Sequence, residues 1–203
     1  MKLCLGGANV KAIAVLGSPR SKKNTDTVLD YAILGLRDMG VEVEKIKLKE
    51  LSINPCISCD ACGKTGKCFK RDDMTGLYEK FDSSDIVVIA SPLYFNSVSS
   101  ITKTMIDRCQ AFWSSKYILN QPLINTKKER KGLFICTAGA PQSEEGFIGA
   151  TVVMDLFFKA INTNYEYNLL LDNTDKLFAG ERNEVLNQAT TIGRELGKYF
   201  STR

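Results

Sequence analysis

Five runs of apolar residues alternate along this chain with stretches in which apolar residues recur every three or four positions. The runs span residues 12–16, 41–46, 86–90, 133–136 and 165–171. The first, third and fourth are almost continuously apolar, which is typical of parallel strands covered by helices on both faces. The second and fifth alternate apolar with polar residues, which indicates strands nearer the edges of a sheet. This pattern predicts an α/β fold.

The stretches between these runs predict the helices that connect the strands. Residues 24–40 predict a helix with polar capping residues at its start and a glycine at its end. Apolar residues at helical spacing predict further helices around residues 101–112, 150–161 and 185–200. Strands and helices in this order predict one doubly wound domain with five parallel strands and helices on both faces. We expect this domain to take in residues 1–203.

The composition excludes several kinds of chemistry. The chain contains no histidine, which excludes Ser-His-Asp and Cys-His catalysis, histidine-ligated zinc or haem, and an imidazole pH switch. We therefore expect a cofactor to carry the chemistry. The formal net charge is only +4 and is dispersed, so no nucleic-acid or anionic-membrane partner is expected.

Location is predicted from what the sequence lacks. No apolar stretch approaches the roughly 18–20 residues of a membrane span. The first residues lack the long apolar centre of a signal peptide. We therefore expect a cytoplasmic protein whose seven cysteines stay reduced and do not form a disulfide framework.

The segment after the first predicted strand is rich in groups that bind anions. Its hydroxyl, guanidinium and amide groups lie beside free backbone N–H groups at the start of a helix, where an anion is favoured. Its candidate binding residues are Ser18, Arg20, Asn24 and Thr25. The alternative is a polar turn whose serine or asparagine caps the helix.

Two more loops follow strands at the same predicted edge of the sheet. The loop after the third strand offers backbone N–H groups and two aromatic rings for a planar ligand, and the loop after the fourth strand would close the pocket. Their candidate residues are Pro92, Leu93, Tyr94, Phe95, Asn96, Thr137 and Gly139. The alternative for the first of these loops is a proline-led turn that buries its aromatic residues.

Residues 49–73 interrupt the alternation with an unusually long loop, and such loops are usually functional. Four cysteines in it follow the pattern C-x2-C-x2-C-x5-C, namely Cys56, Cys59, Cys62 and Cys68. This compact spacing is typical of iron–sulfur ligation. Structural zinc, free thiols and a disulfide pair are the alternatives. Three isolated cysteines, Cys4, Cys109 and Cys136, are expected to be small buried apolar residues.

The motifs together resemble a known superfamily. Gly17-Ser18-Pro19-Arg20 followed by Asn24-Thr25, the segment Ser91–Ser97, and Asp107-Arg108 resemble the flavodoxin-like, NADPH-dependent FMN reductases. The resemblance implies a flavodoxin-like sheet with strand order 2-1-3-4-5. It also implies that the first loop holds the phosphate of FMN and that the second surrounds the isoalloxazine ring. Gly139 stands alone where many relatives carry Gly-Gly.

The cysteine pattern, followed by Asp72-Asp73-Met74, resembles the iron–sulfur flavoprotein branch of this superfamily. The resemblance implies that the four cysteines bind a [4Fe–4S] cluster, which exchanges electrons with FMN, a donor such as a ferredoxin-like protein, and a small acceptor. It also implies a homodimer or homotetramer. An NAD(P)H-dependent FMN or quinone reductase without a cluster is the alternative, and a non-enzymatic flavodoxin-type carrier is a third possibility.

Overall fold

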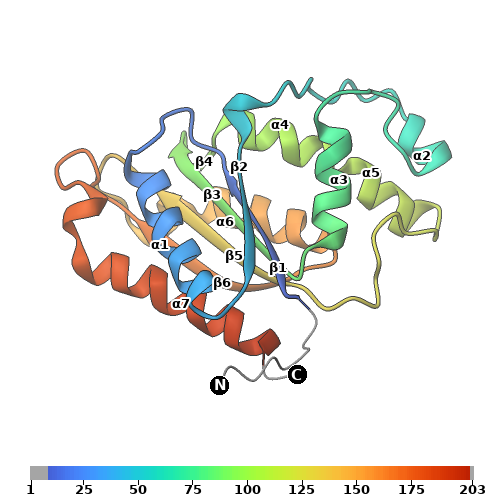
Figure 1. Ribbon diagram of the computed structural model, residues 1–203. Helices are drawn as coiled ribbons and strands as arrows, with labels where there is room; N and C mark the ends of the chain where they lie inside the picture. The colour runs from blue at the N-terminus through green and yellow to red at the C-terminus, as the bar shows by residue number, and fades with distance from the viewer. Residues whose placement is uncertain (1–8, 202–203) are drawn as a thin grey trace, which may run out of the picture.

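The computed structural model describes residues 9–201, and five parallel strands form its central sheet. The strands lie in the order β2-β1-β3-β5-β6, which confirms the predicted five-stranded arrangement with the first strand between the second and third (Figure 1). The predicted fourth and fifth strands are β5 and β6. Their bounds are β1 Lys11–Leu16, β2 Glu42–Lys47, β3 Ile86–Tyr94, β5 Lys131–Thr137 and β6 Asn164–Leu171.

A short sixth strand was not predicted. Strand β4 (Ser97–Val98) turns back on β3 and pairs with it in the antiparallel direction, with Leu93 opposite Val98. Phe95 and Asn96 form the turn between the two strands, and both have left-handed backbone angles, with φ of 49° and 55°. A bulky residue seldom adopts this conformation, so the hairpin could not be predicted from these residues.

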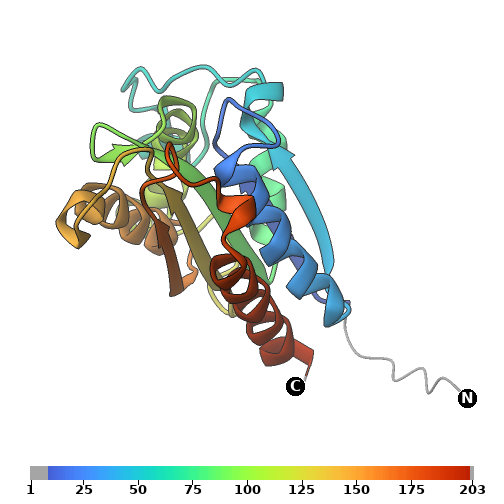
Figure 2. The ribbon, with the colours of Figure 1, turned by 90° about the vertical axis from the view of Figure 1, so that its left-hand side faces the viewer.

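Helices cover both faces of the sheet, as predicted (Figures 1 and 2). One face packs against α1 (Asn24–Asp38) and α7 (Asn183–Ser201). The other packs against α3 (Met74–Ser83), α4 (Ser100–Arg108), α5 (Gln110–Trp113) and α6 (Glu144–Ala160). Alternate residues of β1 enter the two cores, with Ile13 on one side and Ala14 on the other. Burial on both faces explains why the central strands are almost entirely apolar.

Helices α1 and α7 approach each other unusually closely. A Cβ atom on Gly35 of α1 would lie 2.0 Å from the carbonyl oxygen of Thr190 in α7. A Cβ atom on Gly193 of α7 would lie 2.2 Å from the carbonyl oxygen of Ala32 in α1. The two glycines therefore allow backbone to pack directly on backbone at this crossing.

The ends of α1 confirm one expectation and correct another. Gly40 ends the helix in a left-handed conformation, and its N–H donates to the Arg37 carbonyl oxygen while Val41 N–H donates to that of Leu36. This is the hydrogen-bond pattern of a glycine-terminated helix. At the other end the expected side-chain cap is absent from the described residues, because the N-cap residue is Lys23 and its side chain makes no capping hydrogen bond.

The helix predicted around residues 101–112 is divided. Helix α4 ends at Arg108, α5 starts at Gln110, and residues Ser114–Ile118 form a π-helical turn in which Leu119 N–H donates to the Ser114 carbonyl oxygen five residues back. The cysteine loop crosses this region and contains the short helix α2 (Ala61–Thr65), which packs beside the π-helical turn (Figure 1). Two 3₁₀ turns complete the described elements, at Leu48–Glu50 and Ala179–Glu181.

Candidate functional site

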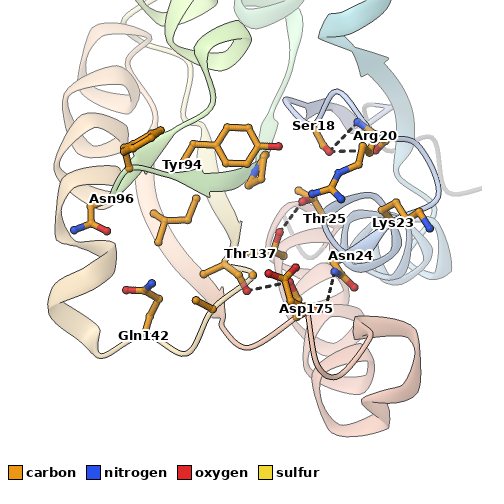
Figure 3. Close-up of a pocket in the computed structure, with 17 residues that line it drawn as sticks. Ser18, Arg20, Lys23, Asn24, Thr25, Tyr94, Asn96, Thr137, Gln142 and Asp175 are labelled. Atoms are coloured by element: carbon orange, nitrogen blue, oxygen red, sulfur yellow. Dashed lines mark hydrogen bonds between the residues drawn. The ribbon is translucent and has the colours of Figure 1, made fainter.

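A cavity of about 330 Å³ opens at the edge of the sheet where β1, β3 and β5 end. In doubly wound sheets, ligands bind in the crevice at this edge, where the strand order reverses. The structure brings all eleven residues of the three predicted binding loops to this cavity (Figure 3). They are Ser18, Arg20, Asn24, Thr25, Pro92, Leu93, Tyr94, Phe95, Asn96, Thr137 and Gly139. Their contacts with a ligand remain a prediction.

The loop after β1 is shaped by its own side chains. The hydroxyl of Ser18 accepts a hydrogen bond from Arg20 N–H at 3.2 Å and donates one to the Arg20 carbonyl oxygen at 3.1 Å. Ser99, at the start of α4, donates its hydroxyl to the Gly17 carbonyl oxygen at 2.6 Å. A Cβ atom on Gly17 would lie 1.8 Å from Thr102 Oγ1, so the loop lies directly on α4. These contacts place the exposed Arg20 side chain at the cavity.

A buried carboxylate supports the same loop from behind. Asp26 accepts a hydrogen bond from Lys22 N–H at 2.6 Å and an ion pair from Lys45 at 2.5 Å. Burial opposes its charge, but the bonds from Lys45 and Lys22 N–H outweigh burial and lower the pKa of Asp26. The negative charge of Asp26 is therefore compensated inside the protein. The cavity side of the loop keeps its positive charge.

Three more of the predicted residues form hydrogen bonds to the protein itself. The amide of Asn24 donates to the Thr174 carbonyl oxygen at 3.2 Å and accepts from Ala179 N–H at 2.9 Å. The hydroxyls of Thr25 and Thr137 are hydrogen-bonded to each other at 2.6 Å and are buried. Asn24 thus ties the segment after β6 to the cavity, and Thr25 ties the start of α1 to the end of β5.

The segment after β6 supplies the part of the cavity that the sequence analysis missed. Asp175 N–H donates to the Gly139 carbonyl oxygen at 3.0 Å, and a Cβ atom on Gly139 would lie 2.4 Å from the Asp175 carboxylate. Thr174 and Asp175 follow the predicted fifth strand at the same edge of the sheet, which was the available signal. The cavity residues not predicted are Lys23, Ala138, Ala140, Gln142, Thr174 and Asp175.

Figure 3 shows how the polar groups are distributed around this cavity. Ser18, Arg20 and Lys23 lie on one side, while Asn96 and Gln142 lie on the other. Tyr94 lies between the two sides and is 39% exposed, and Phe95, which also lines the cavity, is fully exposed. The cavity therefore has a cationic end beside a helix N-terminus and an aromatic wall, which suits a planar ligand with an anionic tail.

A second cavity, of about 470 Å³, contains all four cysteines of the long loop. Cys56 and Cys59 are exposed, and Cys62 and Cys68 are partly buried. Another part of the wall comes from the junction of α4 and α5, namely from Asp107, Arg108, Gln110 and Ala111. In residues 9–201, no group of three or more cysteine or carboxylate residues is close enough to hold a single metal ion.

Arg108 holds both ends of the cysteine loop. Its guanidinium donates two hydrogen bonds to the Asp72 carboxylate, at 2.6 and 3.1 Å, and one to the Asn54 carbonyl oxygen at 2.8 Å. The two side chains are 1% and 6% exposed. Burial works against both charges, but the hydrogen bonds between the partners lower the pKa of Asp72 to about 2 and raise that of Arg108. Asn54 precedes the first cysteine and Asp72 follows the last, so this ion pair closes the loop.

Two polar groups lie at or beside the cysteine cavity. The Nε atom of Arg108 is buried and has no hydrogen-bond partner in the described chain. The hydroxyl of Ser114 lies 3.6 Å from Cys62 Sγ and bonds to it.

The isolated cysteines lie elsewhere. Cys109 and Cys136 are buried in one core, as predicted, and burial raises the pKa of the Cys136 thiol to about 12 and also raises that of Cys109. Cys4 lies outside the described residues.

A family model described as NADPH-dependent FMN reductase matches residues 10–147 of the 203. The chain belongs to the NADPH-dependent FMN reductase family. The match includes the first two loops of the 330 Å³ cavity, Thr137 and Gly139, and the whole cysteine loop. The predicted flavodoxin-like α/β fold of this FMN reductase family member is confirmed, because solved structures with the same arrangement match nearly the whole length of the chain.

Relatives of this FMN reductase family member are named iron–sulfur flavoproteins, which confirms the predicted resemblance. One from Archaeoglobus fulgidus is 34% identical over 68% of this chain and 60% of its own length. A second from the same organism is 38% identical over 54% of each chain. One from Methanocaldococcus jannaschii is 36% identical over 49% of this chain and 51% of its own length. The matched part thus spans little more than half of these relatives.

Similar solved structures confirm the fold. An NAD(P)H:quinone oxidoreductase from Methanothermobacter marburgensis has a TM-score of 0.70 at 17% identity, over 93% of this chain and 100% of its own. An azoreductase from Bacillus anthracis has a TM-score of 0.67 at 13% identity, over 96% and 100%. For residues 9–201 of this family member, none of the helices has the length and apolar character needed to cross a membrane.

Proposed function

We propose that this FMN reductase family member is an FMN-containing oxidoreductase of the iron–sulfur flavoprotein type. It would transfer electrons between a [4Fe–4S] cluster, FMN and a small acceptor. The observation that carries the proposal is the convergence of Cys56, Cys59, Cys62 and Cys68 on one cavity. The names of the relatives support it.

The 330 Å³ cavity has features that suit FMN. Backbone N–H groups at the start of α1, together with Arg20 and Lys23, provide positive charge for the phosphate. Tyr94 and Phe95 provide aromatic surface for the ring, and the left-handed turn at Phe95 and Asn96 is the kind of uncommon backbone that concentrates at functional sites. We assign Asn24 and Thr25 to holding this cavity in shape, because their side chains bond to the protein.

The 470 Å³ cavity has features that suit an iron–sulfur cluster. Its four thiols form the donor set that such clusters use. The unpartnered Nε of Arg108 offers a hydrogen bond to a sulfur atom of a bound cluster. Lys64 and Lys67 in the same loop add further positive charge. A cluster bound there would supply one-electron transfer.

The remaining parts of the proposal concern the whole protein. We propose one FMN-binding domain over residues 1–203 with the cysteine-rich loop at 49–73. The electron donor would be NAD(P)H or a small protein such as a ferredoxin, and the chain would form a homodimer or homotetramer. No partner among nucleic acids or membranes is proposed, and the expected place of action is the cytoplasm.

Metal and flavin analysis of protein purified without oxygen tests the cluster. We expect iron and acid-labile sulfide near four per chain, together with bound FMN. Cys59→Ser should lose iron and sulfide. FMN bound to wild-type protein that contains zinc or no metal would contradict the cluster and support the alternative, an NAD(P)H-dependent FMN or quinone reductase.

A binding measurement tests the phosphate position separately. Arg20→Ala should weaken FMN binding by about ten- to 150-fold, because a hydrogen bond to a charged group contributes about 1.5–3 kcal/mol. Lys49→Ala is the matched control, since Lys49 is an exposed cation outside the cavity. Isothermal titration of the FMN-free protein measures both affinities. Equal affinity in the two variants would place the phosphate elsewhere.

A further inference from the structure

Ser114 has an unusual hydrogen bond for a buried helical serine. It begins the π-helical turn after α5 and is 1% exposed. A serine inside a helix commonly donates its hydroxyl to the carbonyl oxygen four residues earlier, which here would be that of Gln110. Its hydroxyl instead donates to Cys62 Sγ at 3.6 Å. Among the described residues, it is this serine whose side chain donates a hydrogen bond to a cysteine of the loop.

The direction of this hydrogen bond is determined by a neighbour. The Gln110 side-chain amide donates to Ser114 Oγ at 3.3 Å. A hydroxyl has a single hydrogen, and because its oxygen accepts from Gln110, that hydrogen is available for the sulfur. Gln110 and Cys62 both line the cysteine cavity, so the chain Gln110 to Ser114 to Cys62 ends at the proposed ligand.

Packing keeps the two partners of this bond together. Helix α2, which contains Cys62, lies against the π-helical turn. A Cβ atom on Gly66, at the end of α2, would lie 3.4 Å from the Cβ of Ser115. The distance between Ser114 and Cys62 therefore depends on a packed contact between two helical segments.

We propose that Ser114 is a positioning residue that raises the reduction potential of the cluster by donating a hydrogen bond to the Cys62 thiolate. This inference rests on the proposed function, because it requires a cluster at Cys62. A reduced cluster carries one more negative charge than an oxidised one, so the hydroxyl stabilises the reduced form more. Hydrogen bonds to cluster sulfurs are among the factors that determine such potentials.

The test compares variants that keep or remove the hydroxyl. Ser114→Ala removes it, and Ser114→Thr keeps it. Ser115→Ala is the matched control, because Ser115 is an adjacent, equally buried serine whose hydroxyl donates to the Phe112 carbonyl oxygen and accepts from Leu123 N–H instead. Iron, sulfide and FMN are measured first in every protein. The cluster and the flavin are then titrated anaerobically against potential, with electron paramagnetic resonance and visible absorption as separate readouts.

We expect Ser114→Ala to lower the ratio of reduced to oxidised cluster at a fixed potential by up to about tenfold. A tenfold change corresponds to a shift of 59 mV in the reduction potential for one electron. Ser114→Thr, Ser115→Ala and the flavin potential should stay at wild-type values. An unchanged cluster potential in loaded Ser114→Ala, or an equal shift in Ser115→Ala, would overturn the inference.

Two further outcomes keep the inference and the proposed function apart. Wild-type protein without iron and sulfide would overturn the proposed function itself. If Ser114→Ala does not retain a cluster, Gln110→Ala replaces it, because this change leaves the hydroxyl but removes the group that orients it. Gln110→Ala should shift the potential in the same direction by a smaller factor, and an unchanged potential there would overturn the inference.

Discussion

Replacing Asp72 with asparagine tests whether the ion pair with Arg108 holds the cysteine loop closed. The Asp72 carboxylate accepts two hydrogen bonds from Arg108 and one from each of Asn54 N–H, Asn54 Nδ2 and Met74 N–H, at 2.6 to 3.3 Å. Asparagine has nearly the same shape but only one acceptor oxygen, and its NH₂ group would face donors. The change therefore leaves the buried Arg108 charge without its partner.

The expected loss of stability follows from the burial of this pair. Removing one member of a buried ion pair costs about 3–5 kcal/mol, and we expect Asp72→Asn to lower the free energy of unfolding by this amount at neutral pH. Because the pKa of Asp72 falls from 3.8 to about 2 on folding, its ionisation contributes about 2 kcal/mol above pH 4. This contribution is lost as the pH falls from about 4 to 2, because the carboxylate is then protonated.

Urea denaturation of the reduced, metal-free protein at several pH values measures both effects. Asp107→Asn is the matched control, because Asp107 pairs with Lys103 at 2.7 Å while both side chains are nearly half exposed, and such pairs contribute less than about 1 kcal/mol. The stability difference between wild type and Asp72→Asn should narrow by about 2 kcal/mol between pH 4 and pH 2. Equal losses in the two variants, or a difference that does not change with pH, would refute the reasoning.

The other predictions concern the packing of helices and the accessibility of thiols. Gly35→Ala should lower the free energy of unfolding by about 1–3 kcal/mol, because its new Cβ meets α7 backbone, whereas Gly76→Ala, at an exposed position of α3, should raise it by up to about 1 kcal/mol. Urea denaturation measures both, and equal effects would contradict the close helix approach. In native, metal-free protein, iodoacetamide should label Cys59 quickly and leave Cys136 unlabelled, because burial raises the pKa of Cys136 to about 12. Peptide mass spectrometry measures the labelling, and similar rates at the two cysteines would show that the core opens readily.

The central parallel strands were predictable because burial on both faces leaves a strong sequence signal, whereas the order of the strands followed from the resemblance to the flavodoxin-like FMN reductases. Residues 12–16 and 86–90 are almost entirely apolar since two helical layers cover β1 and β3. The shared position of the predicted cavity residues was also predictable, because the carboxyl ends of parallel strands meet at one edge. Thr174 and Asp175 were missed because the segment after β6 carries no binding motif.

Other features depend on tertiary contacts that local sequence does not reveal. The bonds from Asn24 to Thr174 and Ala179 join residues about 150 positions apart, so the sequence did not reveal them, and the predicted contact of Asn24 with a ligand stays a prediction. The left-handed turn at Phe95 contradicts the preference of a bulky residue. The break between α4 and α5 was missed because apolar residues continue at helical spacing across Arg108.

Helix α4 has a further consequence for the proposed electron transfer. Its start is bonded through Ser99 to the loop proposed to bind the FMN phosphate. Its last residue, Arg108, donates hydrogen bonds to both ends of the cysteine loop. At 1.5 Å per residue, its nine residues make a rigid rod about 13 Å long. In the proposed function, this helix would set the separation between the FMN phosphate site and the cluster site, and insertions in either loop would leave that separation unchanged.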